Sequence, residues 1–187
     1  MQLTEKDGKD IIALARKSIS DCFKNRNSEA SSELKKKFSE KQGVFVTLNK
    51  NGELRGCIGF PEPVLPLHKA VIEAAKSAAF SDPRFPILSE NELSQITIEL
   101  SVLTVPELIK VNTAKDYLKK ITVGEDGLII KSGFGSGLLL PQVAVEWGWN
   151  AEEFLMNTCR KACLNKDCWK DLSNRIYKFQ AQIFKED

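Results

Sequence analysis

Six consecutive residues, Leu54-Arg55-Gly56-Cys57-Ile58-Gly59, bring together a thiol, a guanidinium group and two glycines. The thiolate form of cysteine is a nucleophile and a redox group, and a neighbouring cation stabilises its negative charge. Arg55 lies two positions from Cys57, so on a β-strand both side chains point to the same face. The segment therefore predicts a reactive thiol with an adjacent arginine. The alternative is a small core cysteine, because cysteine is among the most buried residue types.

The two glycines support a site at this strand. Glycine inside a strand adds backbone entropy and packs nothing, so Gly56 and Gly59 indicate that another group approaches this backbone closely. That group could be a substrate or a bound partner. We therefore include both glycines among the predicted substrate-binding residues.

Three further polar residues could complete such a site. Asp82 and Arg84 flank Pro83 in residues 81–86, where two prolines predict a rigid surface loop. Glu99 lies on the polar face of an alternating strand expected over residues 96–102. Together they offer two acids and a cation for substrate binding or proton transfer, with Glu99 as a candidate catalytic residue. The structural alternative is that Asp82 opens a turn and that Arg84 pairs with one of the two acids.

Two other residues are weaker candidates. His68 is the only histidine, and it could act as the base for Cys57 if the fold brings the two together. The other interpretation is a histidine on the surface of the helix expected over residues 67–79. Gln142 follows Pro141 at the expected start of another helix, where its amide and free backbone N–H groups could hold an anion.

The remaining cysteines suggest no metal site and no cofactor. Five cysteines are an odd number with no small-scaffold spacing, so we expect reduced thiols rather than a disulfide framework. Cys159, Cys163 and Cys168 form the only cluster, but structural zinc normally takes four ligands in close pairs. We interpret these three cysteines as core residues.

Composition excludes some classes of protein. The chain has 187 residues, and its 27 Lys and Arg against 25 Asp and Glu give a net charge of +2. This balance does not indicate the clustered basic face that a nucleic-acid-binding protein needs, so nucleic acid is an unlikely partner. No run approaches the roughly 18 apolar residues that a membrane span needs, and the first residues are polar where a signal peptide would be apolar. We expect a cytoplasmic protein that does not bind membranes.

Periodicity predicts the elements that would position these side chains. Helices are expected within residues 5–39 and 67–79 and after Asn150, and strands within residues 44–60, 96–102, 121–123, 127–131 and 175–184. Strands in hairpin-like neighbours with helices between them predict an α+β fold with a mainly antiparallel sheet.

The firmest structural prediction is a hairpin that turns at Asn51-Gly52, the strongest short signal for a two-residue type I′ turn. A regular hairpin with this turn has a fixed register. The pairs expected are Lys50 with Glu53, Leu48 with Arg55, Val46 with Cys57, and Val44 with Gly59.

Several segments, taken in order, resemble the AMMECR-type domain family. They are residues 54–59, 82–86, 99–103 and 135–149, so the resemblance covers nearly the whole chain. It implies an α+β fold of intertwined sheet and helix units, with a cleft near the strand that carries Cys57. It also implies a single domain over residues 1–187, either undivided or with a larger and a smaller lobe.

Two functions remain open from the sequence. One is a small enzyme or enzyme component that uses Cys57 and holds an anionic substrate with Arg55 and Arg84. The other is a non-catalytic binding or scaffold module, in which the same groove holds a protein or nucleotide partner.

Overall fold

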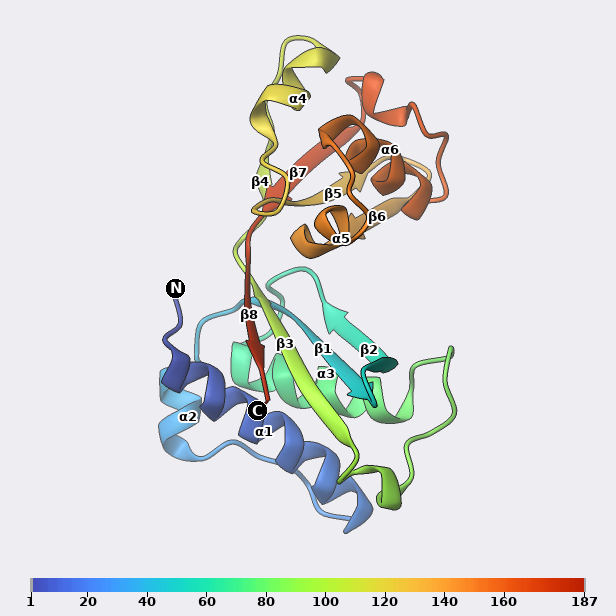
Figure 1. Ribbon diagram of the computed structural model, residues 1–187. Coiled ribbons are helices and arrows are strands. Elements are labelled where there is room, and N and C mark those ends of the chain that lie inside the picture. The colour runs from blue at the N-terminus through green and yellow to red at the C-terminus, as the bar shows by residue number, and fades with distance from the viewer. Residues whose placement is uncertain (1, 187) are drawn as a thin grey trace. The chain divides into compact units, whose positions relative to one another are not determined.

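The computed structural model describes residues 2–186, and the chain divides into two compact units (Figure 1). The first unit holds residues 2–103 and 182–186, and the second is Thr104–Ala181. Each unit contains one four-stranded sheet with helices, and every strand pair with a resolved register is antiparallel. The α+β prediction is confirmed. Within the described residues, no helix is both long and apolar enough to cross a bilayer.

The sheet of the first unit has the strand order β2-β1-β3-β8. Its strands are β1 (Gly43–Lys50), β2 (Glu53–Phe60), β3 (Ile96–Leu103) and β8 (Ala181–Lys185), and its helices are α1 (Glu5–Phe23), α2 (Ser32–Lys37) and α3 (Leu67–Phe80). Val44, Val46 and Leu48 alternate along β1 and are fully buried. Apolar residues of α1 and α3 join them in one core, which includes five buried alanines of α3. Alanine at these positions lets α3 lie close to the sheet.

Helix α3 lies very close to the sheet at Gly56. A Cβ atom on Gly56 would lie 2.2 Å from the carbonyl oxygen of Ala78 on α3. At Gly59 the close neighbour is strand β1, since a Cβ atom on Gly59 would lie 2.3 Å from the carbonyl oxygen of Val44. Both glycines therefore make room for the protein's own backbone.

The β1–β2 hairpin turns at Asn51 and Gly52, whose φ angles of 53° and 84° confirm the predicted turn. The predicted pair of Lys50 with Glu53 is also correct. The other predicted pairs are wrong, because the register shifts between Leu48 and Asn49 and leaves Arg55 as an extra residue in β2. Beyond this bulge the pairs are Leu48 with Gly56, Thr47 with Cys57, Val46 with Ile58 and Phe45 with Gly59.

The sheet of the second unit has the order β4-β7-β5-β6. Its elements are β4 (Glu107–Leu108), α4 (Tyr117–Lys120), β5 (Gly127–Lys131), β6 (Ser136–Leu139), α5 (Pro141–Glu146), α6 (Ala151–Lys161) and β7 (Arg175–Phe179). Asn150 caps the start of helix α6: Glu153 N donates to Asn150 Oδ1 at 3.0 Å, and the Glu153 carboxylate accepts from Asn150 N. This capping box confirms the predicted helix start.

Four sequence predictions that involve the second unit are wrong in whole or in part. Residues 121–123 form no strand, and the single strand expected over residues 175–184 is two strands, β7 and β8, in different sheets. Cys159 and Cys168 form a disulfide with their Cα atoms 6.0 Å apart, so not all thiols are reduced. Cys163 is exposed with a φ of 58°, because the chain turns just after α6. Only Cys159 of the three is a fully buried core residue.

The contact between Gly56 and α3 leads to a first prediction. We expect Gly56→Ala to lower the free energy of unfolding by about 2 kcal/mol, because the added methyl group must push a backbone carbonyl away. Urea denaturation measures this difference. Gly133→Ala is the control, since a Cβ atom there has no other atom within 4 Å. Equal stability of the Gly56→Ala protein and the wild type would contradict this packing.

Candidate functional site

Cys57 lies on the face of the first sheet that is opposite α3. Its neighbour Gly56 faces the helix, and side chains alternate along a strand. The Cys57 side chain is half-buried, and the Thr47 hydroxyl lies 3.3 Å from its sulfur as a hydrogen-bond donor. Cys57 is therefore not a core residue against Val46. The bulge in the hairpin turned it toward the polar residue Thr47 instead.

Glu99 shares a row with these two residues, because Thr47 pairs with Cys57 on one side and with Glu99 on the other. Two strand spacings separate Glu99 from Cys57, which is roughly 10 Å. The Glu99 carboxylate instead accepts a bond from Lys185 on β8 at 2.9 Å. The sheet thus carries a thiol, a hydroxyl and a carboxylate in line, without direct contact between the two predicted catalytic groups.

Asp82 and Arg84 bind the backbone of Cys57. The Cys57 N–H donates to Asp82 Oδ2 at 2.9 Å, and Arg84 Nη2 donates to the Cys57 carbonyl at 3.1 Å. Strand β2 is an edge strand, so these backbone groups point away from β1 to the open edge. The two side chains supply the donor and the acceptor that a fifth strand would supply. They protect the edge from pairing with another strand.

The Asp82–Arg84 pair is itself strongly bonded. Arg84 Nε lies 3.0 Å from Oδ1 of Asp82 and its Nη2 lies 2.7 Å from Oδ2, in the two-bond geometry typical of arginine and carboxylate. The side-chain bond from Arg84 is the main reason that the pKa of Asp82 is well below its usual range. The carboxylate in turn raises the pKa of Arg84.

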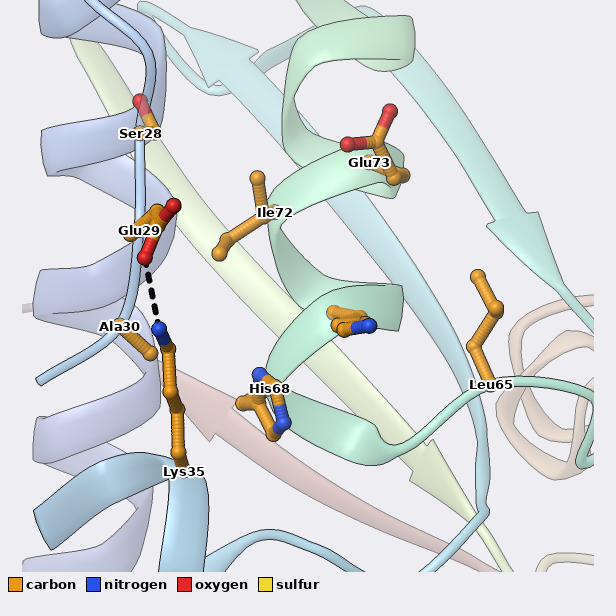
Figure 2. Close-up of a pocket in the computed structure, with 9 residues that line it drawn as sticks. Ser28, Glu29, Ala30, Lys35, Leu65, His68, Ile72 and Glu73 are labelled. Carbon is orange, nitrogen blue, oxygen red and sulfur yellow. Dashed lines mark hydrogen bonds and ion pairs between the residues drawn. The ribbon is translucent and has the colours of Figure 1, made fainter. Parts of the chain in front are cut away.

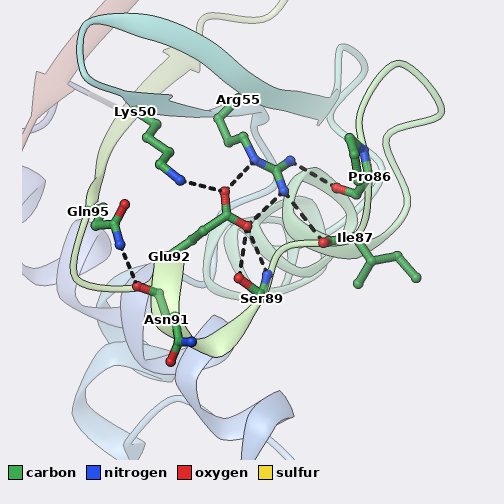
Figure 3. Close-up of polar contacts among 8 residues, drawn as sticks. All are labelled: Lys50, Arg55, Pro86, Ile87, Ser89, Asn91, Glu92 and Gln95. Atoms are coloured by element: carbon green, nitrogen blue, oxygen red, sulfur yellow. Dashed lines mark hydrogen bonds and ion pairs between the residues drawn. The ribbon is translucent and has the colours of Figure 1, made fainter.

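Arg55 is held in a second pair with Glu92 (Figure 3). Its Nε and Nη2 donate to the two carboxylate oxygens of Glu92 at 3.0 and 3.1 Å, and its Nη1 donates to the carbonyl of Pro86 at 2.9 Å. Lys50 and Ser89 also bind this carboxylate. The Arg55 guanidinium is the main reason that the pKa of Glu92 lies well below its usual range.

Glu92 and Thr47 were missed by the sequence analysis. Glu92 has a local signal, since Ser89 and Glu92 form a capping box around the short helical turn Glu90–Glu92. That signal predicts a helix start and not a partner for Arg55. Thr47 has no signal, because its contact with Cys57 depends on the bulge.

His68 lies far from Cys57. It is the second residue of α3, whereas the helix meets β2 at Ala78, ten residues or about 15 Å further along. Its side chain is buried, with 6% of its surface exposed, so the prediction of a surface position is wrong. No hydrogen bond joins His68 to Cys57 within residues 2–186.

Gln142 belongs to the second unit, in the short helix α5, and its role in holding an anion stays a prediction. Within the described part of the chain, no group of three or more His, Cys, Asp or Glu side chains is placed to hold a metal ion.

The Asp82 pair gives a prediction about acid stability. We expect Asp82→Asn to lower the free energy of unfolding at pH 7 by about 2 kcal/mol, since the buried carboxylate loses its charge-assisted hydrogen bonds from Arg84 and from the Cys57 N–H. Because the pKa of Asp82 is lower in the folded protein, this advantage of the wild type is complete above about pH 4 and shrinks as the pH falls further.

Urea titrations of both proteins between pH 2 and pH 7 measure this gap. Glu90→Gln is the control, because Glu90 is an exposed acid of the same segment and its loss should change stability by less than about 0.5 kcal/mol. A gap that is independent of pH would contradict the ionic role of Asp82.

Comparison with known proteins gives a consistent family. The AMMECR1 family model matches residues 12–184. A protein of Methanothermobacter thermautotrophicus is 53% identical over 186 residues, which cover 99% of this chain and 97% of that protein. Protein MJ0810 of Methanocaldococcus jannaschii is 56% identical over 151 residues, covering 80% of this chain and 75% of that protein. The crystal structure of the uncharacterized protein PH0010 from Pyrococcus horikoshii superposes with a TM-score of 0.90 at 47% identity, covering 96% and 91% of the two chains. The chain belongs to the AMMECR1 family.

Proposed function

We propose that the protein is a binding module for a protein partner, and that residues 83–87 form part of the docking surface. This segment, called the 83–87 loop below, follows α3 and runs beside β2. Ile87 has 71% of its surface exposed, and Pro83 and Pro86 are also exposed. Apolar side chains held at the surface are typical of protein docking sites.

The loop is fixed at both ends. At its start, Asp82 and Arg84 bind the backbone of Cys57. At its end, Arg55 donates to the carbonyl of Pro86, and the buried residue Leu88 donates its N–H to Ala79 at 2.9 Å. A loop that is already ordered loses little conformational entropy when it binds, which favours tight binding.

The hydrogen-bond partners of the two arginines are the main support for this proposal. The Arg55 guanidinium forms hydrogen bonds with Glu92 and with backbone carbonyls of the loop. The Arg84 guanidinium forms hydrogen bonds with the Asp82 carboxylate and the Cys57 carbonyl. An anionic substrate would have to displace a carboxylate already in place. These charges therefore support a role in shaping the surface rather than in binding a substrate.

An enzyme that acts through Cys57 is the second candidate. One observation favours it: the thiol is half-buried on the sheet face opposite α3, with the Thr47 hydroxyl beside it. However, no histidine or carboxylate side chain forms a hydrogen bond with this sulfur in the described residues. The candidate lacks the general base that activated nucleophiles commonly use.

Photo-crosslinking tests the docking surface. We expect benzoylphenylalanine at position 87 to give one discrete protein adduct in cells of the source organism, because Ile87 lies within the proposed interface. The same group at position 64 is the control, since Val64 is also exposed, at 53%, in the same unit. No adduct from position 87, or the same adducts from both positions, would contradict the proposal.

Alkylation rates distinguish the two candidates. If Cys57 is not a catalytic nucleophile, we expect iodoacetamide at pH 7.5 to label it several-fold more slowly than Cys163, which is exposed. Peptide mass spectrometry of the folded protein measures both rates in one sample. The Cys57→Ser protein should retain the adduct from position 87. Faster labelling of Cys57 than of Cys163 would favour the enzyme.

A further inference from the structure

The first unit contains a pocket of about 350 Å³ that no part of the proposed function uses (Figure 2). It lies between the segment that joins α1 to α2, helix α2 itself, and the first two turns of α3. Its volume is within the range of small-molecule sites. The residues that line it are Ser28, Glu29, Ala30, Lys35, Leu65, His68, Lys69, Ile72 and Glu73.

His68 is the feature that points to a ligand. The residue is 6% exposed and lines the pocket, and none of the hydrogen bonds within residues 2–186 involves its ring nitrogens. These nitrogens are not among the fully buried polar atoms that lack a partner, so they are accessible to a molecule in the pocket. A ligand atom there would form a hydrogen bond with the ring.

The backbone N–H groups beside His68 are not available to a ligand. The N–H groups at the start of α3 are already taken, since Leu67 donates to the carbonyl of Glu40 and His68 donates to the carbonyl of Phe38. An anion at the helix end therefore has no free backbone donor among these groups. Recognition depends on the side chains.

The charges around the pocket suit one negative charge. Burial lowers the pKa of His68, and the ammonium groups of Lys69 and Lys35 lower it further. The ring is thus neutral at pH 7 and retains one N–H donor. Lys35 is paired with Glu29 at 2.6 Å, and Glu73 with Lys76 at 3.0 Å. Since these acids would repel a dianion, the pocket suits a carboxylate better than a phosphate.

We infer that this pocket binds a small organic carboxylate with an apolar body. The carboxylate accepts hydrogen bonds from the His68 ring and from Lys69, while the apolar body packs against Leu65 and Ile72. Benzoate is a suitable probe, because it has one carboxylate on a small apolar ring. Benzamide has the same shape without the charge.

NMR of the single histidine tests this inference. We expect benzoate to shift the His68 Cε1–H signal saturably and to raise the pKa of His68, because the bound carboxylate stabilises the charged ring. Benzamide and inorganic phosphate should produce neither change at the same concentrations. A response to all three probes, or none to benzoate at 50-fold excess over about 1 mM protein, would overturn the inference.

Lysine variants locate the binding site. We expect Lys69→Gln to weaken benzoate binding about fivefold, the loss typical of one exposed ion pair. Lys36→Gln is the matched control, since Lys36 is exposed on α2 and does not line the pocket. Equal affinities of the two variants would show that benzoate binds elsewhere and would overturn the assignment.

Discussion

The bond between the Asp82 carboxylate and the backbone N–H of Cys57 is the contact on which the candidate site depends. It joins the segment that follows α3 to the open edge of β2. Without it, an N–H and a carbonyl on an edge strand would be available to any other strand. Arg84 completes the cap by neutralising the carboxylate and binding the Cys57 carbonyl. One ion pair thus ends the sheet and fixes the loop.

Charged residues near a cysteine look like catalytic machinery in a sequence, but here they satisfy one another. A buried carboxylate is costly unless a cation and hydrogen bonds accompany it. Asp82 has Arg84 and two backbone N–H groups, and Glu92 has Arg55, Lys50 and the cap at Ser89. This mutual satisfaction explains why the same residues give a rigid surface rather than free groups for a substrate.

Helix α3 separates the two surfaces for which we propose binding. The carboxylate pocket lies at its first turns, and the 83–87 loop leaves from its other end. A helix of 14 residues is about 20 Å long, so the two surfaces do not overlap. A ligand at one end does not block the other. The buried alanines of α3 pack in the core of the first unit, so both surfaces are attached to the same core.

The sequence by itself determined the features that depend on chain neighbours: the turn at Asn51-Gly52, the helix start at Asn150, and the alternation that gives an α+β fold. Tertiary structure alone decided the partners. A bulge placed Cys57 opposite Thr47. Arg55 forms its ion pair with Glu92, which is 37 residues away in the chain. Side-chain pairs between remote segments depend on how the elements pack, and residue type and spacing carry no record of that packing.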